Sequence, residues 1–179
     1  GSTTKQMTAA ALLQKVEDGL VGVDDDLESL LPELEFELDA DWDDEITVHH
    51  LLSHQGGFYD WIPWDGPAGD SELVDSTYDV FDDDYFLMNP PGAFWNYSNP
   101  NFVFAGLVTE TFDSRSWPDI MAEDVFAPLG MERTFLRKAE VEADGDYALS
   151  FGFGVDDLVT GAAGPVEMEG SYALFGADE

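Results

Sequence analysis

The sequence predicts an α+β fold, with helices over most of the chain and extended segments near its end. Apolar residues recur at helical spacing in several segments before residue 126, whereas aromatic residues alternate with glycines beyond Asp144. With 179 residues, 44% of them apolar and 13% aromatic, the chain can bury a core. No internal repeat and no linker rich in Gly, Ser or Pro divides it, so we expect one domain over residues 1–179.

The first helix is expected over residues 2–18. Its apolar residues recur every three or four positions, and Gly19 is suited to end it. Residues 21–26 are expected to form a turn. A short helix over residues 27–31 follows, and Pro32 closes it because proline cannot continue the backbone hydrogen bonds of a helix.

The middle of the chain predicts two further helices. Thr47 is a good N-cap for a helix that runs to His54, because its hydroxyl can accept a hydrogen bond from a backbone N–H of the first turn. A long aromatic and acidic stretch covers residues 56–92. One helix is expected within residues 71–88.

The last part of the chain changes from helical to extended patterns. Asn99 is expected to cap a helix that has Pro100 at its first position. Another helix is expected over residues 116–126. Residues 147–155 and 166–175 alternate aromatic residues with glycines, which favours strands or extended loops.

The charge of the chain is strongly unbalanced. Its 39 acidic and 6 basic residues give a net charge of −33, spread along the whole sequence. Such self-repulsion is tolerated mainly in concentrated salt, because the screening length falls to about 3 Å at 1 M ionic strength. We therefore expect adaptation to a saline environment and no binding to nucleic acid or to anionic membranes.

Two absences limit the possible chemistry. The chain has no cysteine, which excludes disulfides, a thiol nucleophile and a thiolate metal site. Its longest apolar runs, residues 9–13 and 102–108, are too short for a membrane span, and nothing resembles a signal peptide. The cellular location and the oligomeric state stay open.

Two short strings could carry chemistry. Ser2 precedes Lys5 by three positions at the start of an apolar helix, and far downstream the chain reads Tyr97-Ser98-Asn99. A serine is a poor nucleophile unless a neighbouring base accepts its proton, and a lysine one turn away can do so or can set the charge of another base. Each string taken alone is a weak pattern, since Tyr97 could belong to the core and Asn99 is explained as a helix cap.

The order and the surroundings of these strings are more specific. In collinear order the chain carries Gly1–Ala11 with Ser2 and Lys5, Leu20–Asp26, Ile46–Gly57, Pro91-Gly92 leading to Tyr97-Ser98-Asn99, and Phe126–Met131. On these segments the chain resembles the serine beta-lactamase-like family, which includes class C beta-lactamases, D-alanyl-D-alanine carboxypeptidases and related esterases. The resemblance implies a beta-lactamase/transpeptidase-like fold and a serine hydrolase that works through an acyl-enzyme.

The resemblance also implies a role for each site residue. Ser2 would be the acylated nucleophile and Lys5 its partner. Tyr97 would be the general base or its hydrogen-bonded relay, and Asn99 would bind the amide or ester flank of the substrate. Whether Lys5 or Tyr97 takes the proton from Ser2 stays open. The implied substrate is a small-molecule or peptide-like compound with an amide, beta-lactam or ester carbonyl, and no metal or organic cofactor is implied.

One expected motif is missing. Members of the family carry a basic or histidine residue, a small residue and glycine on a strand that supplies an oxyanion donor, whereas Val159-Thr160-Gly161 lacks the basic residue. Loss of one such donor costs about 2.7–4 kcal/mol in the transition state. We therefore expect a fragment that is mainly the helical region of the fold, lacks most of its antiparallel sheet, and is weakly active or inactive. The alternative is a non-catalytic remnant or a partner-binding fragment of the same fold.

Two metal sites are weaker alternatives. His50 and His54 lie one turn apart with His49 adjacent, and such a pair can bind zinc. The other ligands of a helical zinc motif are not in place, so a structural role is favoured. The acidic runs at residues 24–26 and 82–84 lack the alternating acids and central glycine of a calcium loop, which favours solvated surface.

Overall fold

The computed structural model describes residues 2–33, 42, 46–60 and 87–147, together with the backbone of residues 151–152 and 166–167. Apart from its last two positions, the helix expected within residues 71–88 lies outside the described residues. The acidic run at 82–84 and the string at 159–161 also lie outside them.

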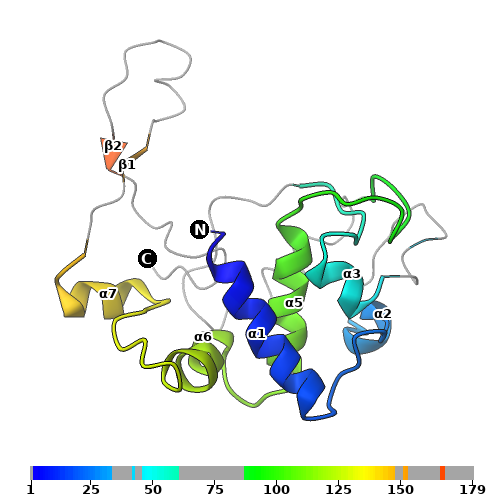
Figure 1. Cartoon of the computed structure of the whole chain (residues 1–179). Coiled ribbons are helices and arrows are strands. Elements are labelled where there is room, and N and C mark those ends of the chain that lie inside the picture. The colour runs from blue at the N-terminus through cyan, green and yellow to red at the C-terminus, as the bar shows by residue number, and fades with distance from the viewer. Residues whose placement is uncertain are drawn as a thin grey trace.

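Two helices that are distant in sequence form the centre of the fold. Helix α1 spans Thr4–Glu17 and helix α5 spans Pro100–Thr111, and Figure 1 shows them side by side. The buried residues of α1 recur every three or four positions and so form one face. They are Thr4, Lys5, Thr8, Ala11, Leu12 and Lys15.

Helix α5 is buried on all sides over most of its length. Every residue from Pro100 to Thr109 is buried. A helix that is hydrophobic all round has to be enclosed by other elements, and here α1 and the short helix α3, Val48–Leu52, both pack against it. Gly106 leaves room for the ring of Trp117, which lies 3.4 Å from the position of an added Cβ. Because α5 is so enclosed, its first turn has a fixed position relative to α1.

The caps of the short helices follow the sequence closely. Helix α2 spans Leu27–Leu30, and the Asp26 side chain accepts a hydrogen bond of 2.9 Å from the backbone N–H of Ser29. Thr47 caps α3 as predicted, because its hydroxyl accepts the backbone N–H of His50 and the His50 ring accepts the backbone N–H of Thr47. This reciprocal pair satisfies two backbone donors that a helix start leaves free.

The helix expected over residues 116–126 has a different form. Helix α6 spans Trp117–Ile120, and a π-helix, η2, continues it over Met121–Phe126. The wider turn is visible in the 2.9 Å hydrogen bond from Ala127 N to Ala122 O, which spans five residues. The prediction of one continuous helix was therefore right about the segment and wrong about its geometry.

The C-terminal elements are short. Helix α7 spans Lys138–Asp144, which the sequence analysis did not predict, and Gly145 ends it with a left-handed φ of +73°. Strands β1, Phe151–Gly152, and β2, Val166–Glu167, pair antiparallel within the two segments expected to be extended. Across the described part of the chain, no helix is long and apolar enough to cross a membrane.

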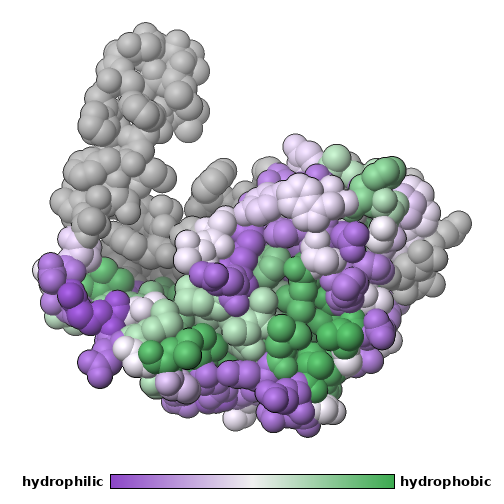
Figure 2. Space-filling model, viewed as in Figure 1, coloured by the Kyte–Doolittle hydropathy of each residue, from purple (hydrophilic) through white to green (hydrophobic). Residues whose placement is uncertain are grey.

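The core lies between the helices, and some apolar surface remains outside it. Figure 2 shows hydrophobic residues gathered on the face that α1 crosses, with hydrophilic residues around them. Leu13 on α1 is 45% exposed and Leu20 is 51% exposed. The larger side chains that are fully buried come from most of the helices and from residues between them: Leu12, Leu27, Leu31, Ile46, Val48, Leu51, Phe58, Phe104, Val108, Trp117, Ile120 and Met121.

Candidate active site

The structure brings the four predicted site residues together. Ser2 Oγ lies 2.6 Å from Tyr97 Oη, and Lys5 Nζ donates a 3.2 Å hydrogen bond to Ser2 Oγ. Lys5 Nζ also donates a 2.5 Å hydrogen bond to Asn99 Oδ1, and Tyr97 Oη donates a longer one of 3.4 Å to the same oxygen. Hydroxyl, amine, phenol and amide therefore form one connected group, although Ser2 and Tyr97 are 95 positions apart.

The start of α1 positions Ser2 and Lys5. Ser2 lies in the turn before the helix rather than in its first turn, because α1 begins at Thr4. Lys5 is only 7% exposed, and its ammonium group lies 5.0 Å from the ring centre of Tyr97 and 5.9 Å from that of Phe102. Aromatic faces attract cations, so the two rings help to hold the Lys5 amine within hydrogen-bonding distance of Ser2.

A second segment, residues 54–60, holds the Tyr97-Ser98-Asn99 string. Asn96 N donates to His54 O at 2.9 Å, and Ser98 N donates to His54 Nδ1 at 3.3 Å. The Asn96 side chain donates to Phe58 O at 3.1 Å. Further along, Asp60 Oδ1 accepts both Asn99 N at 2.8 Å and Asn99 Nδ2 at 3.0 Å. The string is therefore fixed by hydrogen bonds to its backbone and to its side chains.

Two adjacent glycines, Gly56 and Gly57, let the backbone of residues 54–60 pass close to other parts of the chain. A Cβ on Gly56 would collide with the side chains of Asn101 and Phe58. Gly57 has a φ of +83°, which L residues with side chains rarely adopt, and a Cβ there would collide with the carbonyl oxygen of Asn89. His54 itself has a left-handed φ of +57°, a costly conformation for a non-glycine residue. The backbone of this segment is therefore locally strained at His54, and in this conformation the His54 ring accepts the hydrogen bond from Ser98 N.

The side chain of Asn99 does not cap helix α5. Asn99 occupies the N-cap position before Pro100, as predicted, but its backbone is already helical and its side chain makes no capping hydrogen bond. Instead its amide oxygen accepts from Lys5 and its amide nitrogen donates to Asp60. The prediction of a helix cap was therefore wrong for the side chain, which belongs to the candidate site.

The surroundings of Tyr97 and His54 shift their acidities. Burial by itself raises the pKa of Tyr97, but hydrogen bonds with Lys5 and Ser2 and the positive charge of Lys5 together bring that pKa below its ordinary value. Burial and the charge of Lys5 lower the pKa of His54, whose ring lies 4.6 Å from that of Tyr97. A neutral His54 suits the hydrogen bond that its Nδ1 accepts from Ser98.

Sequence reasoning missed two residues of this site. Asp60 is one acidic residue among 39 in the chain, so its type and position gave no signal. His54 was assigned only a structural role. Its contact with Tyr97 depends on the left-handed backbone at His54, which no spacing rule indicates. The adjacent glycines Gly56 and Gly57 are the local signal that could have indicated a close backbone approach at this place.

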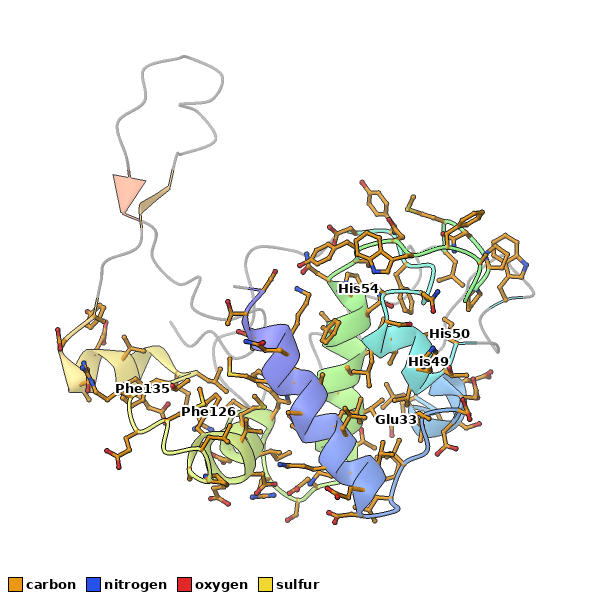
Figure 3. The ribbon with its side chains drawn as sticks, viewed as in Figure 1. Glu33, His49, His50, His54, Phe126 and Phe135 are labelled. Atoms are coloured by element: carbon orange, nitrogen blue, oxygen red, sulfur yellow. The ribbon has the colours of Figure 1, made fainter. Side chains whose placement is uncertain are left out.

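The histidines do not converge on one point. Figure 3 shows His54 beside the N-terminal end of α5, whereas His49 and His50 lie on α3 towards α2. His50 is used in the cap of α3. Within the described ranges, no group of three His, Cys, Asp or Glu side chains is arranged to hold a metal ion.

Comparison with curated relatives places the chain among proteins of related chemistry. It is 27% identical over 163 residues to "Penicillin-binding protein 4*" of Bacillus subtilis (strain 168), covering 86% of this chain and 34% of that protein. It is 33% identical over 153 residues to "Lovastatin esterase" of Penicillium rubens, covering 73% of this chain and 37% of that protein. The chain therefore spans about a third of the length of these relatives.

A solved structure and a family model identify the fold. The octameric penicillin-binding protein homologue from Pyrococcus abyssi superposes with a TM-score of 0.74 at 24% identity, over 99% of this chain and 40% of that one. The chain thus carries part of a beta-lactamase/transpeptidase-like fold, mainly its helical region. The sequence model of the Beta-lactamase family matches residues 1–171, so the chain belongs to the beta-lactamase family.

Proposed function

We propose that the chain is a serine hydrolase of the beta-lactamase-like kind, in which Ser2 attacks an amide, beta-lactam or ester carbonyl and becomes acylated. The observation that carries the proposal is the contact of Ser2 Oγ with both Tyr97 Oη, at 2.6 Å, and Lys5 Nζ, at 3.2 Å. A hydroxyl within reach of a base and a cation is the arrangement that an activated serine needs. The substrate is a small-molecule or peptide-like acyl compound.

Tyr97 is the proposed proton acceptor. Its lowered pKa makes the phenolate easier to form, and Lys5 donates hydrogen bonds to both Ser2 and Asn99. As the Ser2 Oγ–carbon bond forms, the proton of Ser2 passes to Tyr97 and then to the leaving group of the substrate. Water subsequently attacks the acyl-enzyme, passes a proton back through Tyr97, and releases the acid and the free Ser2 hydroxyl.

The names of the relatives support a carbonyl substrate. One relative is named for binding penicillin and another for an esterase activity, and beta-lactams and esters are both attacked by an activated serine.

We also propose that the chain is adapted to concentrated salt. The support is its net charge of −33, which is spread along the sequence. The proposed activity should therefore be measured in molar NaCl, in which the repulsion between exposed carboxylates is screened.

Labelling of the whole chain with a fluorophosphonate tests the nucleophile. Such a probe forms a stable adduct with an activated serine hydroxyl, and peptide mass spectrometry should place the adduct on Ser2 and find none in Ser2→Ala. Ser29→Ala is the matched control, because Ser29 is exposed and its hydroxyl donates to the Asp26 carboxylate at 2.8 Å. A chain with helical circular dichroism but no adduct on Ser2 would contradict the proposal.

A further inference from the structure

The Asp60 carboxylate contacts the proposed catalytic group from the segment of residues 54–60. Its Oδ1 accepts two hydrogen bonds from the same residue, 2.8 Å from Asn99 N and 3.0 Å from Asn99 Nδ2. On its other side, the Asn99 amide oxygen accepts from Lys5 Nζ at 2.5 Å. We propose that Asp60 is a positioning residue that holds Asn99, and through it the Lys5 ammonium, in place for the reaction of Ser2. The inference rests on the proposed function.

Hydrogen-bond chemistry fixes the orientation of the Asn99 amide. A carboxylate can only accept and an ammonium can only donate. The NH₂ group of Asn99 must therefore face Asp60 and its oxygen must face Lys5, as observed. A flipped amide would place its NH₂ group against the ammonium and its oxygen against the carboxylate, and both contacts would be repulsive. Asp60 and Lys5 thus select the same orientation from opposite sides.

Lys5 alone could select the orientation, but it cannot fix the position of Asn99. The hydrogen bond from Asn99 N to Asp60 secures the backbone, at a residue whose side chain makes no capping bond to α5. Asn99 accepts from the same ammonium group that donates to Ser2 Oγ. A displaced Asn99 would therefore let Lys5 move relative to Ser2, and small displacements of catalytic groups can cost up to about a hundredfold in rate.

The negative charge of Asp60 also affects the pKa of Tyr97. Among the described residues, the ionisable groups that face Tyr97 are Lys5 on α1, His54 in the segment after α3, and Asp60, with the Ser2 hydroxyl in direct contact. Of these, Asp60 is negative and opposes the lowering of the Tyr97 pKa. Removal of its charge should make the phenolate easier to form. The pH at which Ser2 labelling reaches half of its maximal rate should then move down.

Three variants separate position from charge. Asp60→Ala removes both, whereas Asp60→Asn keeps an oxygen that can accept the two Asn99 donors. Asp24→Ala is the control for the loss of one exposed carboxylate, because Asp24 is exposed in the turn before α2. Since Asp60 is also exposed, all three variants should unfold at nearly the wild-type urea concentration.

The measurement is the second-order rate constant for fluorophosphonate labelling of Ser2 across a range of pH. We expect Asp60→Ala to label about tenfold or more slowly than wild type, Asp60→Asn to lose less, and both to show a lower pH midpoint. Asp24→Ala should match wild type in rate and in midpoint. In ¹⁵N spectra, the Asn99 side-chain amide signal should move in Asp60→Ala and stay in place in Asp24→Ala.

The possible failures can be told apart. If wild type labels on Ser2 and Asp60→Ala labels equally fast with the same pH midpoint, the positioning role is overturned and the hydrolase proposal stands. If folded wild type gives no adduct on Ser2, the proposed function fails and the role of Asp60 in it fails as well. If Asp60→Ala does not fold, the rate and midpoint of Asp60→Asn decide, and a wild-type midpoint in that variant overturns the proposal.

Discussion

Lys5 is buried, yet within the described residues its ammonium group has hydrogen-bond partners that are neutral rather than carboxylates. Buried cations are usually paired with an anion, because their removal from water is costly. Here a hydroxyl and an amide oxygen replace that anion, and the Tyr97 ring lies 5.0 Å away. A phenolate at Tyr97 would supply the missing negative charge, which is consistent with the lowered pKa of that residue.

Replacement of Tyr97 by phenylalanine tests this interpretation. The variant removes the hydroxyl that contacts Ser2 but keeps the ring, so Ser2 labelling should slow by about 10²–10⁴, the usual contribution of a general base. In wild type the rate should rise with pH to a plateau, with a midpoint below the ordinary tyrosine pKa of about 10, because the folded-state pKa is lowered. The variant should lack this rise.

Tyr147→Phe is the matched control for that experiment. Tyr147 is 39% exposed and Tyr97 is 37% exposed, so both variants remove a similarly accessible hydroxyl. The control should label at the wild-type rate. A Tyr97→Phe variant that keeps both the rate and the pH dependence of wild type would mean that another group takes the proton, and Lys5 would then be the candidate.

The residues of the site differ in how far sequence could predict them. Ser2, Lys5, Tyr97 and Asn99 belong to short strings with fixed spacing, and the structure brings them together. Asp60 contacts Asn99 across 39 positions of sequence, and an exposed carboxylate in so acidic a chain is not distinctive. A long-range contact between common residue types has no local pattern, so only the fold reveals it.

At the scale of elements, an ion-pair network joins α1 to the segment after α5 and to η2. Lys15 on α1 lies 2.6 Å from Asp113, and both side chains are buried, with exposures of 8% and 10%. Arg115 binds Asp113 at 2.8 Å and Asp124 on η2 at 2.6 Å. Lys15 also lies 3.9 Å from Asp124. The network therefore fixes the C-terminal part of α1 against two other elements.

Replacement of Asp113 by asparagine should destabilise the chain by about 2 kcal/mol, because among the described carboxylates it leaves Asp124, at 3.9 Å, to balance the charge of the buried Lys15. The guanidinium of Arg115 first, and the Lys15 ammonium after it, hold the pKa of Asp113 well below its ordinary value of 3.8. Its stabilising effect should therefore be complete at neutral pH and should fade only as the pH falls below that value.

Urea unfolding in molar NaCl at several pH values measures the effect. The difference between wild type and Asp113→Asn should be constant at neutral and mildly acidic pH and should shrink in strong acid. Asp146→Asn is the control, because Asp146 is 86% exposed and pairs with the exposed Arg133, so its loss should cost less than about 1 kcal/mol. Equal losses in the two variants would show that burial of the Lys15 pair is not what matters.

The elements also differ in how well local sequence predicts them. Thr47 and Pro100 mark helix starts by local chemistry, and both starts are where the sequence placed them. The change from α6 to η2 has no such signal. There the six residues Met121–Phe126 adopt the wider π-helical turn while Met121, Val125 and Phe126 are buried. Tertiary packing can override local helix geometry, so the segment was predictable but its turn was not.

For the whole molecule, salt weakens attractive and repulsive interactions between charges to different extents, because screening depends on the distance between the charges. The ion pairs of Lys15, Arg115, Arg133 and Arg137 span 2.5 to 3.9 Å. These distances are close to the screening length of about 3 Å at 1 M ionic strength, so the pairs keep part of their attraction, whereas repulsion between charges farther apart than that length is screened. Concentrated salt therefore removes more repulsion than attraction in a chain with a net charge of −33.

Dialysis from molar NaCl to about 10 mM should consequently unfold the chain, because the screening length then grows to about 30 Å and acidic residues across the whole molecule repel one another. The helical circular dichroism signal should disappear, and it should return when NaCl is restored. A charge-reduced variant tests the cause. Neutralisation of five exposed acids reduces the magnitude of the net charge of −33 by five units, with the substitutions Glu17→Gln, Asp18→Asn, Asp24→Asn, Glu132→Gln and Glu142→Gln.

That variant should stay folded at a lower NaCl concentration than wild type, and KCl should act like NaCl at equal ionic strength, because screening depends on ionic strength and not on the identity of the cation. An unchanged wild-type spectrum at low ionic strength would refute the proposed adaptation to salt. Equal salt midpoints for wild type and the charge-reduced variant would show instead that salt acts by another route, such as stronger burial of apolar surface.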